Sequence, residues 1–89
     1  MQFQWDPEKR ERNLRKHGID FADTESVLDD PMAITVMDDA SGEDRYVSVG
    51  ADTLGRILVL VYTVRRDGAR VISARRATTH ERRTYQEAS

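Results

Sequence analysis

The chain has 89 residues and a mass of 10.2 kDa, a size that fits one small domain and excludes a two-domain architecture. Apolar residues make up 38% and charged residues 34%, a polar composition that still suits a globular fold. Cysteine is absent, which excludes disulfides, thiolate metal ligands and a cysteine nucleophile. The longest apolar run, residues 57–62, is too short to span a bilayer. We therefore expect one soluble, cytoplasmic domain over residues 1–89, with no membrane contact.

Charge is distributed unevenly along the chain. Residues 1–44 carry five Lys or Arg and twelve Asp or Glu, a net charge of −7, whereas residues 45–89 carry nine and four, a net charge of +5. Twelve of the fourteen basic residues are Arg, whose planar guanidinium suits phosphate and carboxylate groups. This bias indicates a local anion-binding patch in the second half. A solvated, Arg-rich surface is the alternative interpretation.

The spacing of apolar residues along the chain alternates between the period of about 3.6 residues of helices and the two-residue period of strands. The predicted elements, in chain order, are a short edge strand at 3–5, helices at 7–17 and 21–28, strands at 33–37, 45–51, 56–65 and 70–75, and a helix at 79–87. This order predicts an α+β domain with a mainly antiparallel four-stranded sheet, two N-terminal helices and one C-terminal helix. The strand at 56–65 is apolar on both faces, so we expect it at the centre of the sheet.

The Asp67-Gly68 dipeptide predicts a hairpin between the last two strands. Two registers are open. A two-residue turn places Arg65 and Arg75 on opposite faces of the sheet, whereas a three-residue turn places them on one face. Only the second register lets both side chains hold one phosphate.

Candidate catalytic side chains gather in the last third of the chain. Thr78 and Glu81 have the spacing of a capping box at the start of the last helix. Glu81, Arg82 and Tyr85 follow one stripe of that helix, and Arg75 ends the preceding strand. We expect these four side chains to converge on one exposed, positively charged pocket. An intrahelical ion pair beside a packed tyrosine is the alternative.

Two histidines and an acidic loop are weaker candidates. His17 and His80 could act as an acid–base pair. However, His17 lies at a helix C-terminus, where the dipole favours a cation, and His80 lies in an exposed first turn. A structural role is therefore the preferred interpretation of both. The acidic segment 38–44 lacks the spacing of a calcium-binding loop, and we predict neither a metal site nor a cofactor.

Several motifs together resemble the BrnT toxins over residues 3–86. They are Trp5-Asp6-Pro7, Lys16-His17-Gly18, Val61-Tyr62-Thr63 with Arg65, Ser73-Ala74-Arg75, and Glu81-Arg82 with Tyr85. The resemblance implies a fold similar to the RelE toxins and a metal-independent endoribonuclease that inhibits growth as the toxin of a type II toxin–antitoxin pair. It also implies a BrnA-type antitoxin with a ribbon-helix-helix DNA-binding part. The two proteins would form a heterotetramer that reaches DNA only through the antitoxin.

The resemblance assigns roles to the candidate residues. The expected catalytic residues are Arg65, Arg75, Glu81, Arg82 and Tyr85, and the expected substrate-binding residues are Lys16, His17 and Arg76. The catalytic arginines would clamp phosphate, Glu81 would act as the base or orient Arg82, and Tyr85 would stack on a base or donate a proton. A non-catalytic module, whose arginines dock an antitoxin or RNA, is the alternative function.

Overall fold

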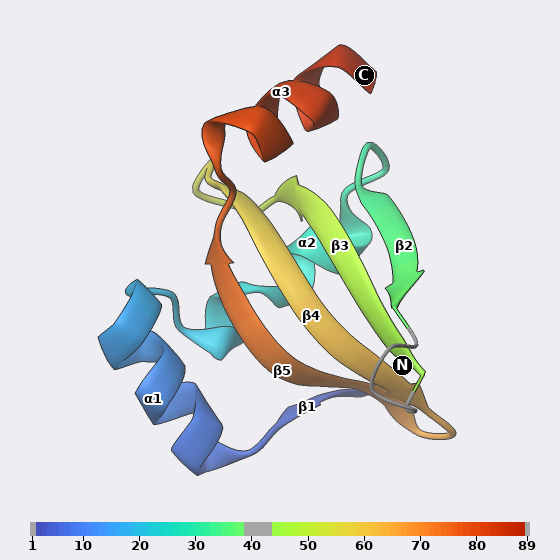
Figure 1. Cartoon of the computed structure of the whole chain (residues 1–89). Helices are drawn as coiled ribbons and strands as arrows, with labels where there is room; N and C mark the ends of the chain where they lie inside the picture. Colours follow the sequence, from blue (N-terminus) through green and yellow to red (C-terminus); the bar gives the residue numbers. More distant parts are fainter. Residues whose placement is uncertain (1, 39–43, 89) are drawn as a thin grey trace.

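The computed structural model describes residues 2–38 and 44–88. Five strands form one mixed sheet in the order β1-β5-β4-β3-β2 (Figure 1). The elements are β1 Gln2–Trp5, α1 Pro7–His17, the 3-10 helix η1 Phe21–Asp23, α2 Glu25–Asp29, β2 Ile34–Asp38, β3 Arg45–Ala51, β4 Ile57–Arg65, β5 Gly68–Arg76 and α3 Thr79–Ala88. The acidic loop predicted from the sequence lies mostly outside the described residues. None of the described helices is long and apolar enough to cross a bilayer.

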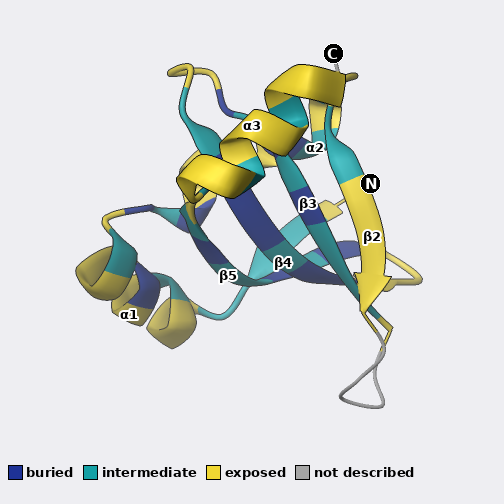
Figure 2. Cartoon of the chain, turned by 45° about the horizontal axis from the view of Figure 1, so that its top comes forward, coloured by how far each residue is buried: buried dark blue, intermediate teal, exposed yellow. Residues whose placement is uncertain are grey.

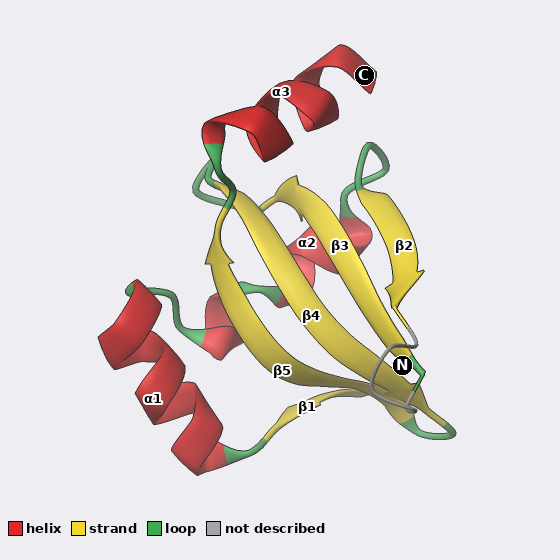
Figure 3. Ribbon diagram, in the orientation of Figure 1, coloured by secondary structure: helices red, strands yellow, loops and turns green. Residues whose placement is uncertain are grey.

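The α+β class and the central position of β4 are confirmed, but the sheet has five strands rather than four (Figure 3). β1 adds to the outer edge of β5 in the parallel direction, so the sheet is mixed. This pairing satisfies backbone groups that an edge strand would leave open. The predicted helix at 21–28 is also wrong in detail, because it is divided into η1 and α2. The buried hydroxyl of Thr24 donates to the Phe21 carbonyl at 2.7 Å and so caps the C-terminal end of η1.

One face of the sheet carries the hydrophobic core. The buried residues of this core are Ile19, Phe21, Val27, Leu58, Leu60, Tyr62, Ala69, Val71 and Ala74. η1 and α2 supply Phe21 and Val27, and α2 lies behind the sheet in the view of Figure 1. Figure 2 shows the buried parts of β4 and β5, with α3 lying across one end of the sheet. The opposite face, here called the open face, presents half-buried Val47 and Val61.

The β4–β5 hairpin has neither of the two predicted registers. The turn consists of Arg66 and Asp67, and Arg65 pairs with Gly68. A β-bulge interrupts the ladder between Val61 and Tyr62, where β5 contains one extra residue, Ile72. Since an extra residue reverses the alternation of side chains in one strand, the bulge changes which residues of β5 face outward.

The bulge brings Arg70, Ser73 and Arg75 of β5 to the open face. Arg70 pairs with Thr63 on one side of the bulge, and Ser73 and Arg75 pair with Val61 and Val59 on the other. Thr63, Val61 and Val59 alternate along one face of β4. Arg70 and Arg75 therefore share a face, although they are an odd number of residues apart.

β1 approaches the hairpin closely at Gly68. Its φ is 144°, and a Cβ atom built on it would lie 1.9 Å from the backbone oxygen of Gln2. The amide of Gln2 also donates to the Asp67 carbonyl at 3.2 Å. A side chain at Gly68 would therefore push β1 off the edge of β5.

We expect Gly68→Ala to lower the free energy of unfolding by about 2 kcal/mol or more, because the new side chain meets both an unfavourable φ and a backbone clash. Gly55→Ala is the matched control, since Gly55 has a φ of 80° and no atom within 4 Å of its ideal Cβ position. Urea unfolding of both variants measures the difference. Equal losses of unfolding free energy in the two variants would show that the clash with β1 adds nothing to the effect of Gly68→Ala.

Candidate functional site

α1 is held against β5 by one buried side chain, Asn13. Its amide nitrogen donates to the carbonyls of Ala74 at 2.8 Å and Ile19 at 2.9 Å, and its amide oxygen accepts from the Ala74 amide at 3.1 Å. β1 pairs with β5 only as far as Val71. Beyond Val71, the Asn13 side chain makes the hydrogen bonds to the backbone of β5 that a neighbouring strand would otherwise make. These bonds fix the position of α1.

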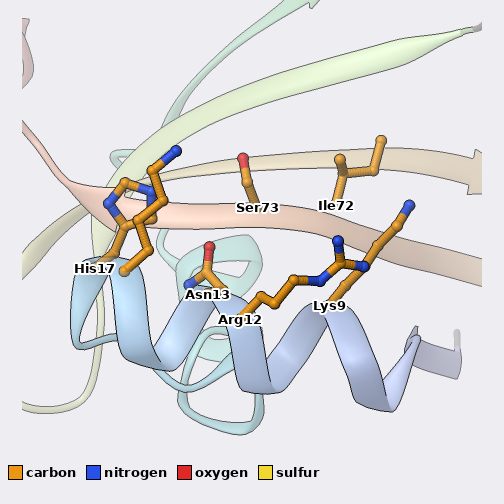
Figure 4. A pocket seen from close by; sticks show the side chains of 7 residues that line it. Lys9, Arg12, Asn13, His17, Ile72 and Ser73 are labelled. Carbon is orange, nitrogen blue, oxygen red and sulfur yellow. The ribbon is translucent and has the colours of Figure 1, made fainter.

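A basic pocket lies between α1 and β5 (Figure 4), here called the α1–β5 pocket. It is lined by Lys9, Arg12, Asn13, Lys16, His17, Ile72 and Ser73. Figure 4 shows His17 beside the Ser73 end of the pocket and Lys9 beside the Ile72 end. The pocket therefore combines three cations, an imidazole and a hydroxyl, which is a set of groups suited to an anion and to proton transfer.

The structure places Lys16 and His17 at the end of α1, as predicted. Lys16 is exposed and His17 is half-buried. The helix ends at Gly18, which has a φ of 71° and whose amide donates to the Leu14 carbonyl at 2.9 Å. Both basic side chains face the part of β5 that carries Ser73. Arg75 follows on the same face of the sheet, about 7 Å further along the strand.

Arg75 and Glu81 form a two-pronged ion pair, with nitrogen–oxygen distances of 2.8 and 2.9 Å. Glu81 also accepts from the Thr78 amide at 2.8 Å, while its own amide donates to the Thr78 hydroxyl at 3.2 Å, which confirms the capping box. The hydrogen bonds from Arg75 and from the Thr78 amide lower the pKa of Glu81 to about 2. Glu81 is therefore a weak proton acceptor that orients Arg75.

Tyr85 lies apart from this ion pair. Its hydroxyl donates to Asp30 at 2.5 Å, and this hydrogen bond raises the pKa of Tyr85. Asp30 also accepts from the amides of Ala51 at 2.8 Å and Met32 at 2.9 Å. Tyr85 therefore ties α3 to the end of α2 and to β3.

Arg82 and Arg76 line a different pocket, together with Arg56. Arg56 is fixed by Asp52, whose carboxylate accepts from its Nε at 2.7 Å. Consecutive residues of a helix point in different directions, and here Arg82 lines this pocket while Glu81 contacts Arg75. The predicted shared pocket of Arg75, Glu81, Arg82 and Tyr85 is therefore wrong. Among the described interactions of these four residues, a side-chain contact joins only Arg75 and Glu81.

Arg65 and Arg75 share the open face but lie far apart. Arg75 pairs with Val59, and Arg65 lies six residues further along β4, a separation of about 20 Å at the rise of a strand. The two guanidinium groups therefore cannot clamp one phosphate. Arg65 instead lies among other basic residues at the hairpin end of the sheet.

The sequence interpretation missed two contributions of α1. Lys9, Asn13 and Lys16 are spaced i, i+4 and i+7, which places them on one face of a helix. That spacing was the available signal for a functional face. The role of Asn13 had no local signal, because its partner Ala74 is 61 residues away in the chain.

The low pKa of Glu81 predicts a loss of stability in acid. A carboxylate whose pKa is 4.5 in the unfolded chain and about 2 in the folded protein stabilises the fold above pH 4.5, and this contribution disappears as the pH falls through about 2. We expect the difference in Tm between the wild type and Glu81→Gln to shrink as the pH falls over this range. Glu87→Gln, at an exposed position, is the control. A difference that stays constant with pH would contradict the assignment.

Comparison with known proteins identifies the family. The family model described as "Ribonuclease toxin, BrnT, of type II toxin-antitoxin system" matches residues 5–81. The crystal structure of the Brucella abortus ribonuclease toxin BrnT is similar, with a TM-score of 0.73 and 32% sequence identity, over 89% of this chain and 99% of the Brucella chain. No curated protein sequence matches significantly. The family model covers most of the chain, which therefore belongs to the BrnT family of ribonuclease toxins of type II toxin–antitoxin systems.

Proposed function

We propose that this toxin is a metal-independent endoribonuclease that cleaves RNA at the α1–β5 pocket and thereby inhibits translation and growth. The observation that carries the proposal is the position of Lys16 and His17 beside Ser73, on the face of β5 that also presents Arg75. A scissile phosphate in this pocket would meet the positive charges and the imidazole of α1, with Arg75 two residues beyond Ser73 on the same face of β5. Membership of a ribonuclease toxin family supports the reaction class.

The reaction needs an attacking 2′-oxygen, a proton acceptor and a proton donor. The 2′-hydroxyl attacks the adjacent phosphorus and loses its proton, while the bond to the 5′-oxygen breaks and that oxygen gains a proton. The products are a 2′,3′-cyclic phosphate and a 5′-hydroxyl. Arg75 and Lys16 stabilise the negative charge that develops on the phosphoryl oxygens.

Proton transfer is assigned to His17 rather than to Glu81. Imidazole is a common general acid and base in enzymes, and the imidazole of His17 lines the pocket beside Ser73. Glu81 holds Arg75 in place, because a carboxylate with a pKa of about 2 accepts protons poorly at neutral pH. Tyr85 is engaged by Asp30, and Arg76 and Arg82 line the pocket beside Arg56, so these three residues act outside the reacting centre.

An antitoxin partner follows from the family, and we propose its type and assembly. The partner is a BrnA-type antitoxin with a ribbon-helix-helix part, which forms a cytoplasmic heterotetramer with the toxin and contacts DNA itself. Support for this proposal comes from the type II toxin–antitoxin family to which the chain belongs. Co-expression of the neighbouring gene should restore growth to cells in which the toxin arrests it.

Purified toxin should cleave RNA in the presence of EDTA. Arg75→Ala should slow cleavage about 100-fold or more, since the loss of one group that stabilises a transition-state charge has this effect in other enzymes. Arg83→Ala, which removes an exposed arginine from α3, is the matched control and should retain wild-type activity. Gel analysis of a labelled RNA gives the rates. Wild-type cleavage by folded Arg75→Ala would remove Arg75 from the mechanism, and no cleavage by any variant would favour a non-catalytic binding module.

A further inference from the structure

A second basic pocket lies on the open face, around Thr63. It is lined by Lys9 of α1, Arg45 of β3, Thr63 and Arg65 of β4, and Arg70 of β5. Lys9 and Ile72 also line the α1–β5 pocket, so the two hollows adjoin. We call this second hollow the Thr63 pocket.

Thr63 forms a polar floor to this pocket. The residue is 9% exposed, and its hydroxyl oxygen is buried with no hydrogen-bond partner among the described residues. A buried hydroxyl without a partner costs free energy, which is why most such groups are paired in folded proteins. A phosphate oxygen bound above Thr63 would accept the missing hydrogen bond after a small shift of the surrounding side chains.

The pocket keeps a net positive charge when its acidic neighbours in the described part of the chain are counted. Four cations line it. Asp38 lies opposite Arg45 in the ladder of β2 and β3, and Asp44 lines an adjoining hollow with Thr63 and Arg65. Among residues 2–38 and 44–88, these two carboxylates set against four cations leave a net charge of about +2, which favours an anion.

The size of the pocket and its position on the sheet indicate that it holds a single group of a longer ligand. Its volume is about 260 Å³, below the range of about 300–1,000 Å³ that is usual for complete small-molecule ligands. The bulge at Ile72 places Arg70 on the same face as Ser73, so the two pockets follow one another along β5. An extended polyanion could therefore occupy both at once.

We propose that the Thr63 pocket binds an RNA phosphate that is not cleaved, on the same strand as the phosphate held in the α1–β5 pocket. The inference rests on the proposed function and names a further part of its substrate. Arg65 and Arg70 are then binding residues that hold the strand, and Arg65 takes no part in the chemical step. This assignment replaces the catalytic role that the family resemblance implied for Arg65.

Binding of a non-cleavable RNA tests the pocket separately from catalysis. The probe is a fluorescent 2′-O-methyl RNA of eight nucleotides, followed by anisotropy at several salt concentrations. Arg70→Ala should weaken binding about tenfold, since it removes a charge-assisted hydrogen bond. It should also reduce the slope of log K against log salt by about 0.7, the contribution of one phosphate contact to a single strand. Arg66→Ala, in the adjoining turn and outside the pocket, should change neither value appreciably.

Thr63→Val provides a second test that separates binding from folding. It removes the unpartnered hydroxyl, so we expect weaker RNA binding with a Tm equal to or above that of the wild type. Equal effects of Arg70→Ala and Arg66→Ala on affinity and salt slope would overturn the proposal. So would unchanged RNA binding by Arg70→Ala together with a loss of antitoxin binding, which would assign the pocket to an acidic protein segment.

Cleavage assays distinguish failure of this inference from failure of the ribonuclease mechanism. If the toxin binds the probe through Arg70 but cleaves no RNA, the proposed role of the Thr63 pocket stands and the proposed catalysis is refuted. If the wild type and Arg70→Ala cleave a long RNA with the same KM, the proposed catalysis stands and the RNA-binding role of the Thr63 pocket is refuted.

Discussion

The hydrogen bonds between the Asn13 side chain and the backbone of Ala74 are the interaction on which the site depends. Lys9, Arg12 and Lys16 all come from α1, and β5 presents Arg70 and Arg75 on its open face, so repulsion between like charges opposes the packing of the helix against the strand. A neutral amide that both donates to and accepts from one residue of β5 fixes the distance and the orientation of the helix together. The ion pair between Arg10 and Asp20, at 2.6 Å, adds a second tie between α1 and the segment that follows it.

The β-bulge in β5 is the second constraint, and it determines the charge of the open face. With regular alternation, Arg70 and Arg75 would point to opposite sides, and one of them would enter the hydrophobic core. The extra residue Ile72 places both on the open face and keeps Val71 and Ala74 in the core. Bulges are common beside functional sites for this reason, since they redirect side chains without ending the strand. The interrupted ladder therefore places both arginines on the same face of the sheet.

Local signals were sufficient for much of the fold and for little of the site. The caps of α1, the bounds of β3 and the capping box of α3 each depend on neighbouring residues, and each was predictable. The parallel pairing of β1 and the bulge at Ile72 depend on contacts between distant segments, which no short pattern reports. The same limit applies to the site. The short separation of Arg75 and Glu81 in the sequence was enough to predict that they lie close together. The contacts of Tyr85 with Asp30 and of Asn13 with Ala74 join residues far apart in the chain, so no local spacing reports them.

The affinity of Asn13→Ala for the non-cleavable RNA tests most directly whether the docking of α1 creates the site. Hydrogen exchange of the β4 amides would establish that the sheet of the variant remains folded. Asn13 carries no charge, yet the displaced helix should weaken binding about tenfold or more, as small misplacements of positioned groups do in enzymes. Wild-type affinity in a variant whose Ala74 amide has lost its protection would contradict this role, because the basic residues of α1 would then bind RNA without being held against β5.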